Sequence, residues 1–539
     1  MNIKITPTPL SGTVRAISSK SHAHRLLIAT AISEFQLLKN KANMFSEAES
    51  HCSHEHHVHE HNCTCSHLHE HCTHEQHSHN HHHAHADGHC CSTSPLEDSL
   101  MQMHEFQQSV LSKVQINDWN EDLEATKNCI FQLQKDNPVF DCNESGSTLR
   151  FMLPVAMALK THALFCGAGR LPDRPISPLK EQMENHGCYI ILPQSYFQGG
   201  NNHKSTENSA ETSTSSNKIS RLIAIVDGGL KSGHYKLPGN VSSQYITGLL
   251  FALPLLEGDS TLEITSPLES AGYVDLTLDV LKQFGVEISV SQSPSPISNT
   301  YNLENNRPIY HIRGNQQFIF PESDANKASC LCCHDTLDGP THVHAEGDWS
   351  NAAFWIVADL LSNIKAAKSK TDDLTPSVIC KDLDLNSSQG DKQIVDFVDI
   401  IRKNITTSTT LTFNVAQVPD LVPILAVLAC ARQTGTTNIV NAGRLRIKES
   451  DRLATVREML ENLGATIFEG EDCLSIKGTG NLIGGVVNGH NDHRIVMASA
   501  IASILCSDPV SIIGAEAVNK SYPVFWDDFS KLGGKYHEI

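Results

Sequence analysis

The sequence predicts an α/β protein with two domains, and three observations support this prediction. Strand-like segments of β-branched or alternating residues recur beside helix-like ones, as where 222–226 precedes 244–256. Two amphipathic runs, 276–284 and 451–463, stop at a glycine and lead into an extended segment, which hints at an internal repeat. The chain has 539 residues, whereas single hydrophobic cores stop growing at roughly 250–300 residues.

The elements can be placed in order from capping and stop signals. The repeated unit of cap, helix, glycine and strand is expected at Asp275, 276–284, Gly285 and 286–290, then at Asp451, 452–463, Gly464 and 466–468. A strand at 511–513 precedes a last helix at 524–532. Buried helices are expected in the apolar runs 26–32, 151–159, 245–256, 421–431 and 495–505.

One tract departs from this pattern. His51 to His89 holds 17 of the 31 histidines within 39 residues, along with Cys52, Cys63, Cys65 and Cys72. We expect 33–115 to be an inserted surface loop without fixed structure, and 194–217 to be a second polar insertion. The first tract would bind Zn, Ni or Cu incidentally, and we favour this over metal storage or sensing because no single four-ligand constellation stands out.

Composition excludes several classes of protein. Lys and Arg number 41 against 60 Asp and Glu, a net charge of −19, which argues against a nucleic-acid-binding surface. No apolar run reaches the length of a membrane-spanning helix, and the N-terminus resembles a strand rather than a signal peptide. We therefore expect a cytoplasmic protein with reduced thiols, with any anionic ligand held in a local cationic pocket.

Small polar and cationic residues stand at the start of several predicted helices. In 19–25, Lys20 and Arg25 fall in the first turns of a helix, where free N–H groups favour anions. An exposed helix start with basic residues would show the same sequence pattern. The small-residue turn 144–150 and the Pro-fixed arginines of 169–176 offer similar anion contacts, but the latter could be a surface loop. Ser242, the first residue of S-S-Q, could cap a helix or hold a ligand.

The second half of the chain repeats this arrangement. Asp420 precedes an apolar helix, and from the sequence alone it is more readily a helix cap than a carboxylate in a cleft. Charged residues gather in 444–453, where a solvated ion-paired face is the alternative. The segments 491–494 and 519–523 add further cations at helix starts. Together these features predict helix N-termini converging on a polyanionic ligand between two domains.

The motifs resemble those of the 5-enolpyruvylshikimate-3-phosphate synthase family, and the match extends over nearly the whole chain outside the insertions. They are S-K-S-x-x-x-R at 19–25, E-S-G-S-T-L-R at 144–150, D-R-P-I at 173–176, S-S-Q at 242–244, E-G-D-W-S at 346–350, R-I-K-E-S-D-R-L at 446–453 and N-D-H-R at 491–494. Seven ordered motifs make a chance match implausible.

The resemblance implies a fold and a reaction. The fold would be two domains of three repeated α/β units each, with helices facing the interdomain cleft: residues 20–345, and residues 1–19 with 346–539. Hinges would lie near 19–20 and 345–347. The reaction would transfer the enolpyruvyl group of phosphoenolpyruvate to the 5-hydroxyl of shikimate 3-phosphate with loss of phosphate. No metal or organic cofactor, nucleic acid or membrane is implied, and a monomer is expected.

The resemblance also assigns site residues. Shikimate 3-phosphate would contact Lys20, Ser21, Arg25, Ser242, Ser243, Gln244, Ser270, Tyr273, Asp420 and Lys448. Phosphoenolpyruvate would contact Lys20, Gly146, Arg174, Gln244, Arg452, Arg494 and Lys520. The catalytic set would be Asp420 as base and Glu449 as proton donor, assisted by Lys20, Lys448 and His493.

Three points qualify this assignment. Glu449 would need a raised pKa, yet nearby Lys and Arg would lower it, so a relay would have to recharge it. Glu144 and Arg444 stand where many family members have Asn, and both are left out of the site.

The phosphoenolpyruvate-like herbicide glyphosate is expected to inhibit, because Gly146 leaves room that Ala would fill.

Two other functions compete with this one. The sister enzyme that uses UDP-N-acetylglucosamine has Lys-Asn where this chain has Lys20-Ser21, and it lacks N-D-H-R. A metal-binding scaffold that has lost activity would not be expected to keep the whole charged set, from Lys20 to Lys520.

Overall fold

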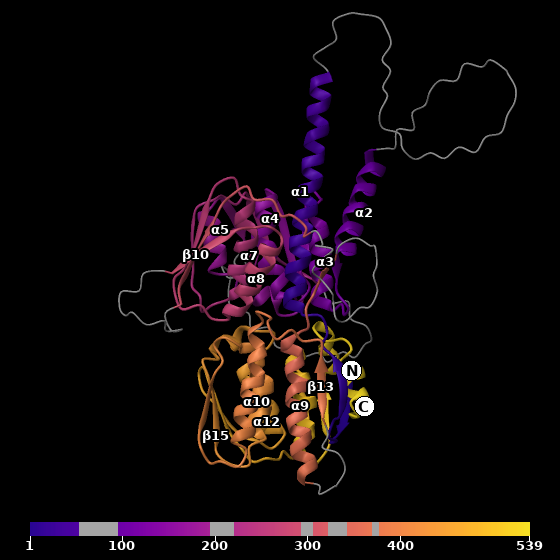
Figure 1. The fold of residues 1–539 in the computed structure, drawn as a ribbon, viewed down its shortest axis with the longest axis vertical. Coiled ribbons are helices and arrows are strands. Elements are labelled where there is room, and N and C mark those ends of the chain that lie inside the picture. The colour runs from indigo at the N-terminus through magenta and orange to yellow at the C-terminus, as the bar shows by residue number, and fades with distance from the viewer. Residues whose placement is uncertain (53–94, 194–219, 293–305, 322–341, 369–376) are drawn as a thin grey trace, which may run out of the picture.

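A computed structural model describes residues 1–52, 95–193, 220–292, 306–321, 342–368 and 377–539. Figure 1 shows two bodies stacked end to end, with the N-terminal strand lying in the same body as the C-terminus. The first body packs around a hydrophobic core that runs from Ala23 to Val343. The second body packs around a core formed by residues from Ile3 to Ile17 and from Trp349 to Leu532.

Four sheets of four strands share one pairing pattern, a parallel pair followed by two antiparallel pairs. In the first body they are β4 (Val139–Asp141), β5 (His162–Gly167), β7 (Arg221–Gly228) and β6 (Cys188–Ile191), then β8 (His234–Leu237), β9 (Ser260–Ile264), β11 (Pro308–Ile312) and β10 (Ile288–Gln292). In the second they are β14 (Leu411–Asn414), β15 (Thr436–Val440), β17 (Leu474–Lys477) and β16 (Thr466–Glu469), then β18 (Gly485–Asn488), β19 (Val510–Ile513), β1 (Asn2–Thr6) and β20 (Lys535–Glu538).

Each of these sheets belongs to a unit with the same order of elements, strand–helix–strand–helix–strand–strand. The helices of the four units are α4 (Gly146–Leu159) and α5 (Leu179–Asn185), α7 (Ser243–Ala252) and α8 (Ala271–Gln283), α11 (Val422–Cys430) and α12 (Arg452–Asn462), and α13 (His493–Ala502) and α14 (Phe525–Lys531). The fourth unit takes its last strand, β1, from the N-terminus. The repeat expected from the sequence is therefore present in both bodies.

A third unit in each body is built on two-stranded parallel sheets. β2 (Gly12–Arg15) pairs with β13 (Val378–Lys381), and β3 (Val114–Gln115) pairs with β12 (Val343–His344). Their helices are α1 (Lys20–Cys52), α2 (Pro95–Lys113) and α3 (Glu121–Gln132) in the first body and α9 (Trp349–Lys368) and α10 (Ile394–Lys403) in the second. The fold is thus three α/β units in each of two bodies, as predicted.

The chain crosses between the bodies twice, and the two crossings lie side by side. The Ser19 backbone N–H donates to the Glu346 carbonyl at 2.7 Å, and Ser18 forms an antiparallel bridge with Gly347. Both crossings come directly before a helix, α1 in one case and α9 in the other.

Several helix caps follow the sequence signals. The side chains of Ser145, Ser242, Asp451 and Asp492 each accept a hydrogen bond from a backbone N–H in the first turn of their helices. The start of α8 differs from the prediction. α8 begins at Ala271 instead of after Asp275, because Ser270 turns the chain in the left-handed region, at φ 55°, and its backbone N–H bonds to the Ala416 carbonyl of the second body.

The first insertion is also shorter than predicted. α1 continues to Cys52 and α2 begins at Pro95, so both flanks of the expected loop are helical. Phe106 and Val110 of α2 are buried in the first core, and Glu34 accepts from Ser109 and pairs with Lys113. Residues 53–94, with most of the His/Cys tract, and residues 194–219 lie outside the described part of the chain. Within the described residues, no helix is long and apolar enough to cross a bilayer.

α4 and α7 approach closely at Gly248. A Cβ there would lie 2.3 Å from the Arg150 carbonyl oxygen and 2.8 Å from Pro154 Cγ. Glycine inside a helix usually costs about 0.5–1 kcal/mol relative to alanine, so close packing explains its presence here. We expect Gly248→Ala to lower the free energy of unfolding by about 1–3 kcal/mol through overpacking, measured by denaturant titration.

Gly229 provides the matched control for this substitution. A Cβ on Gly229 would meet no atom within 4 Å, so Gly229→Ala is expected to change stability by less than about 0.5 kcal/mol. Equal effects of the two substitutions would contradict the packing argument.

Candidate active site

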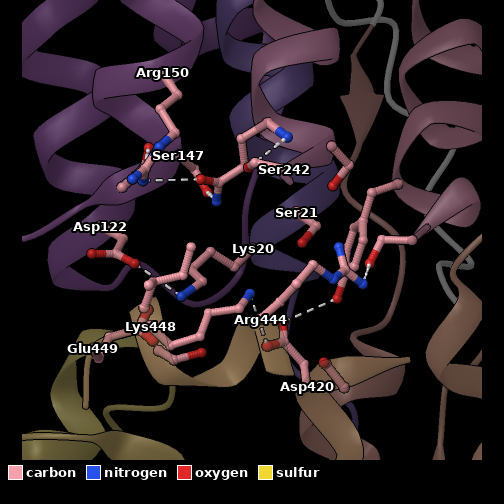
Figure 2. A pocket seen from close by; sticks show the side chains of 18 of the residues that line it. Lys20, Ser21, Asp122, Ser147, Arg150, Ser242, Asp420, Arg444, Lys448 and Glu449 are labelled. Carbon is pink, nitrogen blue, oxygen red and sulfur yellow. Dashed lines mark hydrogen bonds and ion pairs between the residues drawn. The ribbon is translucent and has the colours of Figure 1, made fainter. Parts of the chain in front are cut away.

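A polar pocket lies between the two bodies, and the starts of helices from both bodies surround it. α1, α4, α7 and α8 contribute their first turns from the first body, and α12 and α13 contribute theirs from the second. Free backbone N–H groups and helix dipoles at these ends favour anions. Figure 2 shows Ser21, Ser147 and Ser242 on the side of the first body, facing Asp420, Lys448 and Glu449 on the side of the second.

Nearly the whole predicted set lines this pocket. The lining includes Lys20, Ser21, Arg25, Gly146, Arg174, Ser242, Ser243, Gln244, Ser270, Tyr273, Asp420, Lys448, Glu449, Arg452, His493 and Arg494. Lys520 lies beside it instead. Its Nζ is 2.5 Å from Glu144 Oε2 of the first body and 2.7 Å from the Asn491 carbonyl, and Asn491 Nδ2 also donates to Glu144 at 3.0 Å.

The wall on the first body is held by hydrogen bonds between helix starts. Lys20 Nζ lies 2.9 Å from Asp122 Oδ2. Arg150 Nη1 donates to Gln244 Oε1 at 3.1 Å, and Gln244 Nε2 donates to Ser147 Oγ at 3.0 Å. These contacts fix the α4 and α7 ends of the pocket relative to each other.

Arg25 lines the pocket, and its guanidinium also connects three helices. It is only 3% exposed, and burial lowers its pKa to about 9. Its guanidinium donates to Thr277 Oγ1 at 2.8 Å, to Thr247 Oγ1 at 3.2 Å and to the Tyr273 carbonyl at 2.7 Å. Most of its donors therefore join α1, α7 and α8, and the guanidinium supplies positive charge to the floor of the pocket.

Gly146 brings the backbone close to two guanidinium groups. A Cβ on Gly146 would lie 2.6 Å from Arg150 Nη1 and 2.7 Å from Arg174 Nη1. Burial, followed by the charge of Arg150, lowers the pKa of Arg174 to about 10, which still leaves it cationic at neutral pH. A residue larger than glycine would press on both arginines.

Asp420 points into the pocket and does not cap its helix, which corrects the reading favoured from the sequence alone. Its Oδ1 lies 2.8 Å from Arg452 Nη1 and 3.4 Å from Lys448 Nζ, and its Oδ2 lies 3.4 Å from Arg494 Nη2. Burial favours the neutral acid, but the charges of Arg494, Lys448 and Arg452 lower the pKa of Asp420 well below its usual value. Asp420 is therefore an ionised carboxylate at neutral pH.

Arg452 links three carboxylates although its side chain is only 1% exposed. Its guanidinium contacts Asp492 at 2.8 Å, Asp420 at 2.8 Å and Glu449 at 2.7 Å. Burial opposes the charge of Arg452, but Asp492, Glu449 and Asp420 raise its pKa. It is a permanent cation at the centre of the second-body wall.

The pKa values of Glu449 and His493 are both lowered, so that Glu449 is ionised and His493 is neutral. Burial would raise the pKa of Glu449, but the charges of Arg452, Arg174 and Lys448 lower it well below its usual value. Burial, with Lys20 and Arg494, lowers the pKa of His493, so its imidazole is neutral. Among the described residues neither ring nitrogen of His493 has a hydrogen-bond partner, although the residue is only 2% exposed. The ring is available to a ligand in the pocket.

Several pocket residues were missed by the sequence analysis. They are Asp122, Ser147, Arg150, Tyr245, Asp348, Ser350, Arg444 and Ser521. Arg150 and Ser350 stood inside quoted motifs, and a charge inside the apolar run after Gly146 was a readable signal. Arg444 was set aside, yet it crosses between the bodies: Nε lies 2.6 Å from Glu269 Oε2, and Nη2 donates to Ser270 Oγ at 3.1 Å. The charged face proposed as an alternative exists too, where Arg446 pairs with Asp451 and Glu469.

The pocket is suited to polyanions rather than to metal ions. Guanidinium and ammonium groups dominate its walls, and those side chains do not ligate metals. Across the part of the chain that the structure describes, no three His, Cys, Asp or Glu side chains are grouped to hold a metal ion. The arrangement can bind two anionic ligands beside two ionised carboxylates, Asp420 and Glu449, and one neutral imidazole, His493.

Comparisons with known proteins identify relatives at the level of sequence and fold. The profile of the family described as EPSP synthase (3-phosphoshikimate 1-carboxyvinyltransferase) matches residues 203–313 and 334–529. The chain is 41% identical over 415 residues to the 3-phosphoshikimate 1-carboxyvinyltransferase of Clostridium novyi, covering 75% of this chain and 78% of that protein. The Clostridium kluyveri enzyme of the same name is 37% identical over 460 residues, covering 80% and 91%.

Two solved structures share the fold. The EPSP synthase of Acinetobacter baumannii aligns with a TM-score of 0.57 at 17% identity, covering 99% of each chain. The enolpyruvyl transferase NikO from Streptomyces tendae aligns with a TM-score of 0.54 at 12% identity, covering 100% of this chain and 98% of that one.

The position of Arg452 generates a prediction about stability. Replacing Arg452 with Ala leaves the fully buried carboxylate of Asp492 without its cation, so we expect a loss of about 3–5 kcal/mol in the free energy of unfolding. Denaturant titration at neutral pH measures this loss.

Arg457 is the matched control on the same helix. It is 37% exposed and pairs with Glu461 and Glu469 at the surface, so Arg457→Ala should cost at most about 1 kcal/mol. The difference should shrink in acid. Asp420 and Glu449 have lowered pKa values, so their contribution exists above the ordinary carboxyl pKa and is lost as pH falls. A difference that is the same at all pH values would contradict the charge argument.

Proposed function

The chain belongs to the EPSP synthase family, and on this premise we propose how its pocket carries out the family's reaction. That reaction transfers the enolpyruvyl group of phosphoenolpyruvate to the 5-hydroxyl of shikimate 3-phosphate and releases phosphate, within the shikimate pathway to chorismate and the aromatic amino acids. The observation that carries the proposal is that cations from both bodies line one pocket, in which Lys448, Arg452 and Arg494 hold Asp420 as an ionised carboxylate.

The first-body wall would bind shikimate 3-phosphate. Ser242, Ser243 and Ser270 lie at helix starts, where their hydroxyls and the backbone N–H groups can donate to phosphate and ring hydroxyls. Lys20, Ser21, Gln244 and Lys448 complete this set, and Arg25 and Tyr273 supply charge and shape. Phosphate attracts Lys20 away from Asp122 because it carries more negative charge than one carboxylate.

Phosphoenolpyruvate would bind against Gly146, between Arg174 on one side and Arg452 and Arg494 on the other. Carboxylate and phosphate groups suit guanidinium forks, which donate two parallel hydrogen bonds. Lys520 would join this set after leaving Glu144, 2.5 Å away across the interface. A net charge of −19 is compatible with two anionic substrates, because the cations are concentrated here.

Asp420 would act as the base toward the attacking hydroxyl. A carboxylate that is ionised at neutral pH, and positioned by Arg452 and Lys448, can accept a hydrogen bond from that hydroxyl and take its proton as the new C–O bond forms. The product of this step is a tetrahedral intermediate that then loses phosphate.

Glu449 would be the proton donor to the methylene carbon, with His493 assisting. Its lowered pKa means that it is not protonated at rest. A relay must therefore deliver its proton, and His493, whose ring nitrogens face the same pocket, is suited to that task.

We assign the two domains to residues 20–345 and to residues 1–19 with 346–539. The separate hydrophobic cores and the paired crossings at Ser19 and Glu346 support these limits. Closure about these crossings would complete the site and exclude water. We further propose a cytoplasmic monomer; described residues of the two bodies supply both walls of the pocket, which is compatible with a site built from a single chain.

The direct test is phosphate release from purified, metal-free protein. We expect release with phosphoenolpyruvate and shikimate 3-phosphate, none with UDP-N-acetylglucosamine as acceptor, and a loss of kcat of about 10²–10⁴-fold in Asp420→Asn. Replacing residues 53–94 with a short Gly-Ser linker should leave kcat unchanged. Release only with the UDP-sugar would favour the sister transferase, and no release with either acceptor would favour an inactive scaffold.

Gly146→Ala is expected to reduce inhibition by glyphosate. The added methyl would press on Arg150 and Arg174, so it should weaken glyphosate and raise the KM for phosphoenolpyruvate, with a smaller effect on the KM for shikimate 3-phosphate. Steady-state kinetics with glyphosate titration measure this. A variant as sensitive as the wild type would contradict the steric argument.

A further inference from the structure

A second aspartate lies behind the pocket, where the reaction described above does not use it. Asp391 belongs to a short 3-10 turn, Gly390–Gln393, and is only 3% exposed. Its Oδ2 accepts a short hydrogen bond from Ser350 Oγ and another from the Tyr273 hydroxyl at 3.1 Å. Within the described residues its Oδ1 is buried without a hydrogen-bond partner.

Tyr273 connects this carboxyl group to the proposed base. Its hydroxyl oxygen lies 3.1 Å from Asp391 Oδ2 and 3.2 Å from Asp420 Oδ2. A phenol has one hydrogen, so it can donate to only one of the two carboxylates at a time. The second close oxygen–oxygen contact is favourable only when a carboxyl group donates back to the phenol oxygen. The arrangement is therefore favourable when one of the two carboxyl groups, Asp391 or Asp420, carries a proton in addition to the phenol hydrogen of Tyr273.

The two carboxyl groups differ in their surroundings. Asp420 faces Lys448, Arg452 and Arg494, which stabilise its charge. Asp391 faces Tyr273 of α8, Ser350 and Asp348 at the start of α9, Asp420, and Arg494 of α13. Burial, followed by the charge of Asp420, raises the pKa of Asp391 to about 6, against the partial effect of Arg494. A proton is thus more stable on Asp391 than on Asp420.

We propose that Asp391 holds the proton that Asp420 removes from the substrate hydroxyl. The proton is transferred from Asp420 to Asp391 through the hydroxyl of Tyr273. The substrate O–H bond breaks as its oxygen bonds to the enolpyruvyl carbon, and Asp420 gains the proton. Asp420 then gives a proton to the Tyr273 oxygen while Tyr273 gives its own to Asp391. Asp420 is returned to its ionised form, and one proton has moved to Asp391.

This inference rests on the proposed role of Asp420. Because Asp391 acts through Tyr273 and does not touch the reacting atoms, it is a positioning residue for the proton. Tyr273 comes from the first body and both aspartates from the second, so the connection exists only while the bodies are closed on each other. Opening would separate Tyr273 from Asp391 and allow the proton to leave to water.

The test is the pH dependence of kcat in Asp391→Asn with both substrates saturating. Asn has a similar shape but cannot gain a proton, so we expect kcat to fall on the order of 10–100-fold, with the KM for shikimate 3-phosphate changed less than about threefold. In the wild type, kcat should fall as pH drops through about 6, where Asp391 becomes protonated and can accept no more. That acid limb should be absent from Asp391→Asn and should return in Asp391→Glu.

Two further variants keep the test decisive. Tyr273→Phe removes the relay while leaving both aspartates, and it should lose the same acid limb even if Asp391→Asn does not fold. Asp399→Asn, an exposed residue of α10, is the control that should match the wild type.

Wild-type kcat with an unchanged acid limb in Asp391→Asn or in Tyr273→Phe would overturn the inference. If Asp420→Asn remains fully active, the proposed base is wrong. If Asp420→Asn is inactive while Asp391→Asn keeps both kcat and the acid limb, only the relay is wrong.

Discussion

The rest of the site depends on the ion pairs that the buried guanidinium of Arg452 makes with three carboxylates. A charge with 1% of its side chain exposed is tolerated only because Asp420, Glu449 and Asp492 surround it. Asp492 is also the N-cap of α13, so one ion pair joins the starts of two helices. The same cation lowers the pKa values of Asp420 and Glu449, which keeps both ionised in the pocket between the bodies. Arg452 thus both joins the starts of two helices and sets the charge state of two carboxylates.

The repeated unit explains why so many helix starts meet in one place. In each four-stranded unit the first helix follows the first strand of a parallel pair and returns to the second, so helices of different units begin at equivalent edges. Two bodies with three units each then bring these edges together (Figure 1). A fold with alternating helix directions would mix positive and negative helix ends, whereas this one concentrates positive ends around the pocket.

Local signals in the sequence were sufficient for the fold class, the caps at Ser242 and Asp451 and the glycine stops, because each depends on neighbouring residues. Nearly all the residues that the family resemblance assigned to the site line the pocket. What the sequence could not provide are pairings between distant segments. Asp122 with Lys20, Glu144 with Lys520 and Asp391 with Tyr273 each join residues more than 100 positions apart. The helical flanks of the first insertion were missed for a similar reason, since α2 is held by contacts such as Ser109 with Glu34.

The position of β1 constrains the order in which a newly made chain can fold. β1 is synthesised long before β19 and β20, yet it lies between these two strands. The core of the first body is complete once Val343 has been made, so it can fold on the ribosome. In the second body, Ile3 and Ile5 cannot take their final positions until Val510 to Glu538 have been synthesised, because residues 510–538 supply both strands that pair with β1. The half that carries Asp420, Glu449 and Arg452 is therefore completed only after Val510 to Glu538 have been synthesised, so the pocket between the bodies forms much later than the core of the first body.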